Sequence, residues 1–266
     1  MLASPEAFGA VVACPTSSPG APIRSVNSAG NGCAEIDKSF TNISITNMSG
    51  AGAPDATGIY MFATGTPPIG NTISPVGVTF DTPGPGATWN VTGGASIAET
   101  INYQVNANTG GSYPTPATPG LVWAINQIAL TPSVNIQNFF GGTNDNATIT
   151  LAFCLNATSC TGTASGTIVA TYSGTNTAVY SCSYSGCVSG TSNTVNLTGS
   201  VTQIAIAESL TINSSPVSPL NSVTINSIQN QFGEVAALGP VPEPATFVLI
   251  GAGLLGIALR KLRAPG

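Results

Sequence analysis

The sequence predicts an all-β protein: one antiparallel β-sandwich or jelly-roll-like domain, followed by a short C-terminal hydrophobic helix. Short stretches with alternating apolar and polar residues recur along the chain and are rich in Val, Ile and Thr, which is typical of half-buried strands. Gly, Pro, Asn and Ser separate these stretches, as they do in turns. No window before the C-terminus gives a convincing 3.6-residue period of an amphipathic helix. Many short strands without helices favour a sandwich or jelly roll.

The strand-like stretches and their connections give the expected domain organisation. The β domain is expected to span residues 1–232, with a linker at 233–241 and a sorting segment at 242–266. The sequence Thr-Ile-Asn-Ser occurs at 211–214 and again at 224–227, which predicts the two arms of a hairpin. The expected strands lie at 40–45, 76–80, 88–91, 97–105, 122–130, 147–153, 167–172, 201–212 and 222–228.

Charged residues are very few. The 266 residues contain 5 Lys and Arg against 10 Asp and Glu, a net charge of −5. Three of the basic residues (Arg260, Lys261 and Arg263) lie close to the C-terminus, which leaves only Arg24 and Lys38 for the rest of the chain. Such a body repels phosphate backbones, so nucleic acid is excluded as a partner.

The 6 cysteines indicate an oxidising compartment, because an even number clustered in sequence is typical of disulfides. Pairing neighbours in sequence closes three short loops, although crossed pairing among the last four is a close alternative. We expect neither a metal nor a cofactor, since the chain has no CxxC motif and no histidine. The expected pairs are Cys14–Cys33, Cys154–Cys160 and Cys182–Cys187.

The C-terminal segment is a candidate membrane helix. From Ala245 to Leu259 the chain carries no charge; as a helix this segment spans about 22 Å, short of the roughly 30 Å hydrocarbon core. That length suits a transient or processed anchor better than a permanent one. The basic residues at 260–263 then stop translocation and stay cytoplasmic, which places the body outside the cytoplasm.

Pro242, Glu243 and Pro244, the apolar run and the basic stop (Arg260, Lys261 and Arg263) together resemble the PEP-CTERM sorting signal. The same type of tail is also catalogued as an ice-binding protein C-terminal domain. The resemblance implies that an exosortase is the processing partner and that the inner membrane holds the precursor transiently. The body is then released to the cell envelope or the extracellular matrix. A secretory signal is also expected, but residues 1–10 show neither its basic end nor its apolar core.

Histidine-dependent catalysis is excluded, because the chain has no histidine. Glycoside hydrolysis needs only two carboxylates and therefore remains open. A calcium site at residues 144–146 is a weaker alternative to an Asx turn. The candidate carboxylates for hydrolysis are Glu35 with Asp37, or Glu99, Asp145 and Glu208.

Sugar binding would use exposed aromatic side chains, and ice binding would use regular ranks of threonine. We expect Trp89 and Trp123 in the core, and Tyr113 and Tyr184 on the surface. Thr148, Ile149 and Thr150 form part of a strand, but no sequence repeat aligns its threonines with others.

The sequence therefore favours a non-enzymatic envelope or matrix protein associated with exopolysaccharide. A surface-displayed carbohydrate- or ice-binding module is the alternative, and a glycoside hydrolase comes third.

Overall fold

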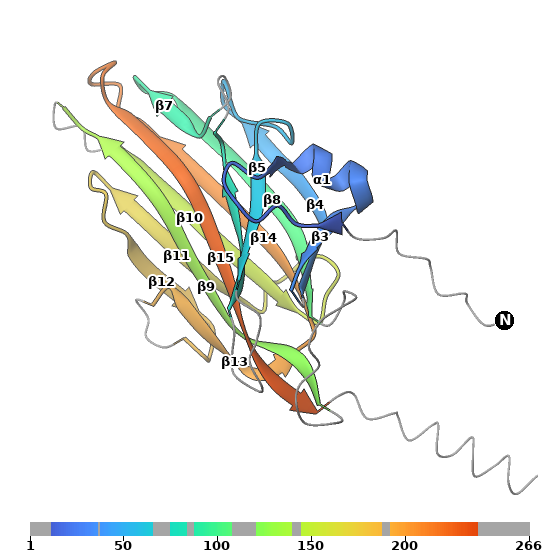
Figure 1. Ribbon diagram of the computed structural model, residues 1–266. Helices are drawn as coiled ribbons and strands as arrows, with labels where there is room; N and C mark the ends of the chain where they lie inside the picture. The colour runs from blue at the N-terminus through green and yellow to red at the C-terminus, as the bar shows by residue number, and fades with distance from the viewer. Residues whose placement is uncertain are drawn as a thin grey trace, which may run out of the picture.

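The structure is a computed structural model that describes residues 12–36, 38–65, 75–83, 88–107, 121–139, 145–187 and 192–238. Two β-sheets pack face to face in an elongated sandwich (Figure 1), and neighbouring strands run antiparallel except for the short β1–β3 pair. The predicted all-β antiparallel sandwich is confirmed.

Sheet A has eight strands, and its centre is built from long strands that pair over most of their length. In spatial order it contains β1 (Val12–Ala13), β3 (Gly32–Glu35), β4 (Lys38–Ser49), β8 (Ser96–Ala107), β14 (Gln203–Asn213), β10 (Asn146–Leu155), β11 (Gly166–Ser173) and β12 (Val179–Ser183).

Sheet B has seven strands and is organised around β15, which pairs with β9 along its whole length and carries β6 and β7 on its other edge. The last strand of the body therefore lies inside sheet B, with paired strands on both of its edges. The strands are β13 (Thr194–Val201), β9 (Leu121–Gln137), β15 (Ser222–Leu238), β6 (Val76–Asp81), β7 (Asn90–Thr92), β5 (Tyr60–Gly65) and β2 (Ala21–Pro22).

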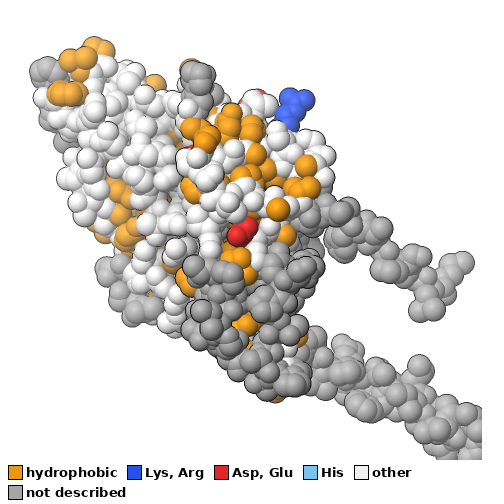
Figure 2. Space-filling model, viewed as in Figure 1, with side chains coloured by type: hydrophobic (Ala, Val, Ile, Leu, Met, Phe, Trp, Pro, Cys, Tyr) orange, Lys and Arg blue, Asp and Glu red, His pale blue; other side chains and the backbone are white. Residues whose placement is uncertain are grey.

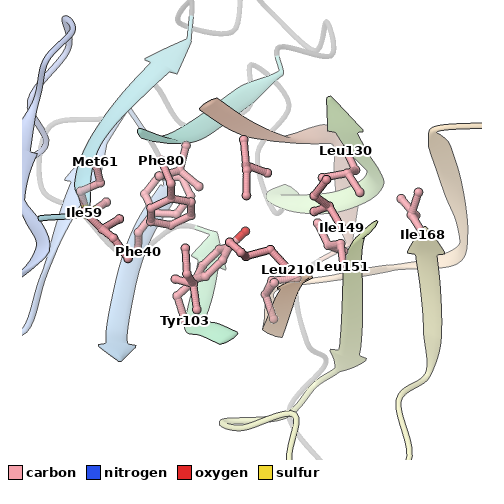
Figure 3. Close-up of a cluster of buried hydrophobic side chains, with 14 of the residues drawn as sticks. Phe40, Ile59, Met61, Phe80, Tyr103, Leu130, Ile149, Leu151, Ile168 and Leu210 are labelled. Atoms are coloured by element: carbon pink, nitrogen blue, oxygen red, sulfur yellow. The ribbon is translucent and has the colours of Figure 1, made fainter. Parts of the chain in front are cut away.

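The core lies between the sheets, where alternate residues of each strand point inward. Figure 3 shows side chains from both sheets meeting in this layer. Aromatic pairs cross it: Phe40 of β4 packs on Phe232 of β15 at 6.2 Å between ring centroids, and Tyr103 of β8 packs on Phe80 of β6 at 5.4 Å. Trp89 and Trp123 are buried, as predicted.

Polar groups also join the two sheets inside the core. Asn230 of β15 donates from Nδ2 to the Tyr103 hydroxyl and to Oε2 of Glu208, each at 2.8 Å. Lys38 of β4 and Glu234 of β15 form a fully buried ion pair, with 2.7 Å between Nζ and Oε1. Since a buried charge needs a partner, these contacts fix how the sheets face each other.

All three disulfides form between the cysteines that are neighbours in sequence, as predicted: Cys14–Cys33, Cys154–Cys160 and Cys182–Cys187. The first ties β3 to the residue after β1, the second closes the loop after β10, and the third closes the end of β12.

The predicted hairpin at 211–227 is wrong, because its two arms lie in different sheets. Thr211 belongs to β14 of sheet A and Thr224 to β15 of sheet B. The buried carboxylate of Asp145 holds the connection between them: it accepts from the Ser215 amide at 2.6 Å and from Nδ2 of Asn221 at 3.1 Å. These long-range contacts anchor both ends of the crossing in place of a hairpin turn.

Two further expectations differ from the structure. The helix α1 (Ile23–Gly30) was not expected; it contacts β3 and β4 and ends at Asn31, which adopts a left-handed conformation with φ 58°. Residues 233–238 do not form a linker but complete β15, with Glu234 fully buried. The folded body therefore continues to Leu238.

A candidate ligand-binding cleft

A cleft of about 540 Å³ lies on the outer face of sheet A, between β4, β8, β14 and the loop that follows β10. Its described lining residues are all neutral, and most of them have polar side chains. The described residues that line it are Asn42, Ser44, Thr46, Asn47, Thr100, Asn102, Tyr103, Thr158, Ser159, Cys160, Thr161, Ile206 and Ala207.

The shape of the cleft follows from irregularities in β4. Its pairing with β8 shifts register twice, between Thr41 and Ser44 and between Thr46 and Ser49. Asn42 and Asn47 lie in these two intervals with φ 55°, a left-handed conformation that asparagine tolerates better than most residues. Each bulge bends the strand locally. The loop closed by the disulfide Cys154–Cys160 forms the facing wall.

Side-chain amides on this face hold one another in place. Asn102 donates to Oγ1 of Thr46 at 2.9 Å, and Asn42 donates to Oε1 of Gln104 at 2.8 Å. Gln104 in turn donates to Oδ1 of Asn106 at 2.8 Å. Because each amide is anchored by a neighbour, the cleft presents donors and acceptors in fixed positions. Such a surface can bind hydroxyl groups without first ordering its own side chains.

Hydroxyl side chains form rows across the outer face of sheet A, which the sequence alone did not reveal. Thr148 lies opposite Thr171 on one side and Thr211 on the other. Strand pairing also generates a second row, in which successive neighbours are Thr150, Ser209, Thr100 and Thr46. Strand register places these residues side by side, although they are far apart in sequence and follow no repeat.

The expected aromatic sugar-binding platform is not found among the described tyrosines and tryptophans, none of which is exposed. Tyr184, predicted to be on the surface, is half-buried: its ring packs edge-on against Phe153, with 5.4 Å between centroids. Its hydroxyl also lies 3.0 Å from Oγ1 of Thr198. Tyr113 lies outside the described residues. The described part of this face therefore offers a ligand hydrogen-bonding groups and no tyrosine or tryptophan platform.

The candidate catalytic carboxylates lie elsewhere. Glu99 and Glu208 are buried between the sheets, and burial raises the pKa of Glu99 to about 7 and that of Glu208 to about 8. The bond from Asn230 opposes the shift at Glu208. Neither glutamate lines the cleft, whose described lining contains no carboxylate.

The other candidate acids do not form a site either. Partial burial raises the pKa of the Glu35 carboxyl on β3, and its proposed partner Asp37 lies outside the described residues. Asp145 uses both carboxylate oxygens to hold Ser215 and Asn221, so it anchors a distant connection. Asn144, of the expected calcium site or Asx turn, lies outside the described residues. The part of the chain that the structure describes contains no group of three or more His, Cys, Asp or Glu side chains arranged to hold a metal.

The predicted sorting residues (Pro242, Glu243, Pro244, Ala245, Leu259, Arg260, Lys261 and Arg263) all lie outside the described residues. Within the described ranges, no helix has the length and apolar character needed to cross a membrane. The sorting segment is instead identified by its similarity to a known protein family.

Residues 240–264 match the PEP-CTERM protein-sorting motif. The match covers the proline-acid-proline sequence, the apolar run and the basic stop, and so confirms the resemblance seen in the sequence. The PEP-CTERM motif supports an exported protein that is sorted through an exosortase and held transiently at the membrane. No curated protein and no solved structure gives a significant match to the chain.

Proposed function

We propose that this chain is a non-enzymatic protein of the cell envelope or extracellular matrix, and that its body binds neutral exopolysaccharide through the cleft on sheet A. The observation that carries the proposal is the PEP-CTERM match at residues 240–264, because it supports an exported body, and an exported body can meet exopolysaccharide.

The chemistry of the cleft supports a neutral sugar as ligand. Most of its described side chains carry amides or hydroxyls, which donate and accept hydrogen bonds as sugar hydroxyls do. Since the described lining of the cleft offers no exposed aromatic ring, we expect each sugar unit to bind weakly. Long polysaccharides offset weak contacts by presenting many copies of the same unit.

The arrangement of acids supports a non-enzymatic role. Hydrolysis of a glycosidic bond uses two carboxyl groups that flank the bond, roughly 5–10 Å apart. The buried glutamates Glu99 and Glu208 lie in the interior of the sandwich, away from the cleft that a sugar chain would enter.

Mass spectrometry of the mature C-terminus tests the sorting part. Protein recovered outside the cell should end upstream of Arg263 in a host with an active exosortase, and should stay intact and membrane-bound when the exosortase gene is deleted. Replacing Glu243 with Ala should have the same effect as the deletion. Released protein that still contains Arg263 would refute sorting by this route.

Cosedimentation of the released protein with purified host exopolysaccharide tests the binding part. Asn102→Ala removes an anchored amide from the cleft and should weaken binding several-fold. Gln229→Ala, on the outer side of sheet B, is the matched control and should have no effect. Equal binding by both variants would show that the cleft is not the binding site.

The rows of hydroxyls favour a second candidate function, binding to ice. Neighbouring strands lie about 4.8 Å apart, so the row of Thr150, Ser209 and Thr100 presents hydroxyls at regular intervals. Thermal hysteresis and inhibition of ice recrystallisation test this function. Thr150→Tyr should abolish both if it operates, whereas Thr131→Tyr on sheet B should leave both unchanged. No activity in the unaltered protein would eliminate this candidate.

A further inference from the structure

A second cleft lies on the outer face of sheet B, where one edge of β15 changes partner. β6 pairs with residues 227–232 of β15 and β7 pairs with residues 222–224. Between them, at Asn226, the pairing of β15 with β9 on the other edge is interrupted by a register shift. The resulting cleft has a volume of about 300 Å³, and its lining includes Asp81, Thr82, Asn90, Thr224 and Asn226.

Asp81 differs from every other described residue in this lining, because it is the one acid among neutral side chains. The residue is only 8% exposed, and its Oδ1 atom is buried without a hydrogen-bond partner among the described residues. Oδ2 accepts one long bond, from the Ser18 hydroxyl at 3.5 Å. A buried carboxylate with so few donors is costly, and its burial raises the pKa of Asp81 to about 6. A ligand that enters the cleft and donates hydrogen bonds to this carboxylate would offset that cost.

A metal ion fits this cleft poorly. Calcium in proteins is held by six to eight oxygen atoms, usually from more than one carboxylate. Here a single carboxylate faces amides and hydroxyls, and the described residues contain no cluster of acids near it that could neutralise a divalent ion.

A pair of hydroxyl groups fits it well. Two neighbouring O–H groups can donate to the two oxygens of one carboxylate, and bonds to a charged acceptor are stronger than neutral ones. The Thr224 hydroxyl donates to Oδ1 of Asn90 at 3.2 Å and so orients the Asn90 side chain. In this orientation the Asn90 NH₂ group can donate to an oxygen of a ligand. Together these groups match the alternating donors and acceptors of a sugar ring.

We propose that the Asp81 cleft binds one sugar unit through a pair of adjacent hydroxyls. The site lies on the sheet opposite the first cleft, so one molecule can hold two polysaccharide strands and cross-link them. The choice of a sugar as ligand rests on the proposed function; the need for hydroxyl donors rests on Asp81 itself.

Titration of the full chain tests the site directly. The protein is kept in a detergent without a sugar headgroup and titrated with the methyl glycosides of glucose, galactose and mannose. Asp81→Asn should weaken binding of the preferred glycoside about tenfold or more, because a charge-assisted acceptor is lost. Asp55→Asn is the matched control, since Asp55 is an acid that caps an exposed turn through Thr57. Equal affinity in the Asp81 and Asp55 variants would overturn the proposal, as would calcium binding that Asp81→Asn abolishes.

Cross-linking separates this proposal from the proposed function. Adding the released protein to dissolved exopolysaccharide should raise turbidity, and Asp81→Asn should remove the turbidity while cosedimentation persists through the first cleft. If exopolysaccharide does not bind at all but a glycoside still binds at Asp81, the proposed function fails and the site stands. If Asp81→Asn leaves both turbidity and glycoside binding unchanged, the site fails and the proposed function stands. A urea midpoint equal to that of the unaltered protein confirms that the variant is folded.

Discussion

The buried ion pair between Lys38 and Glu234 gives the sharpest test of how the body is held together. Lys38 begins β4 in sheet A, and Glu234 lies near the end of β15 in sheet B. Both side chains are fully buried, with 2.7 Å between Nζ and Oε1. Replacing Lys38 with Met keeps the length of the side chain but removes its charge, so the carboxylate stays in the core without its cationic partner.

The expected cost follows from burial. Breaking a buried pair by removing one partner typically costs about 3–5 kcal/mol, because the remaining charge has lost its water and its counter-ion. Replacing both partners with apolar residues of similar volume is often neutral or stabilising. We therefore expect Lys38→Met to lower the free energy of unfolding by about 3–5 kcal/mol. The double variant Lys38→Met with Glu234→Leu should recover most of that loss.

Urea unfolding of the disulfide-intact protein, followed by tryptophan fluorescence, measures these differences. Arg24→Met is the matched control, because Arg24 is the other basic residue of the body and is exposed; it should change stability by less than about 0.5 kcal/mol. Two results would refute the reasoning. One is a loss for Lys38→Met no larger than that of the control. The other is a double variant as unstable as the sum of its single changes.

Three other properties can be measured on the same protein. Burial raises the pKa of Glu208 from its ordinary value of 4.5 to about 8 in the folded state. Its contribution to the free energy of unfolding is therefore fully present below about pH 4.5 and is lost as pH rises toward 8. Glu208→Gln should reduce the slope of this fall by about one proton, and an unchanged slope would contradict the assignment. Removing the disulfide Cys14–Cys33, with a sequence separation of 19, should lower the free energy of unfolding by about 3 kcal/mol. Removing Cys154–Cys160, with a separation of 6, should lower it by about 2 kcal/mol. Calorimetry of the two double-serine variants shows which loss is larger. Asn42→Gly should be tolerated in β4, while Asn42→Val should lower the thermal midpoint by several degrees, because φ 55° is unfavourable for a β-branched residue.

The features that were predicted correctly depend on short-range patterns. Alternation identifies strands such as β10 and β11, because one face of each is buried. Short sequence separation favours the pairing of Cys182 with Cys187. The helix α1 escaped prediction because its eight residues include Ser, Asn and Gly, which are weak helix formers.

Long-range contacts explain what the sequence did not reveal. The repeated Thr-Ile-Asn-Ser sequence resembles a hairpin locally, but Asp145, some 70 residues away, directs the chain across to the other sheet. Residues 233–238 include one Gly and two Ala and resemble a linker. They are nevertheless part of the core, because Glu234 forms a fully buried ion pair with the distant Lys38. The rows of hydroxyls and both clefts arise from strand register and bulges, which no local pattern specifies.

The course of β15 sets how far the Asp81 cleft lies from the last described residue before the sorting motif. The strand begins at the connection from sheet A and ends at Leu238 (Figure 1), just before the matched sorting motif at 240–264. From Asn226, at the Asp81 cleft, the strand continues for about 40 Å before it reaches Leu238. The Asp81 cleft therefore lies toward the end of the body that is remote from the tail. The face shown in Figure 2 carries very few charged side chains, as the charge content of the sequence leads one to expect. For a precursor that its tail holds at the membrane, we therefore expect the Asp81 cleft on the part of the body remote from the bilayer, where the polymer that we propose it binds can reach it.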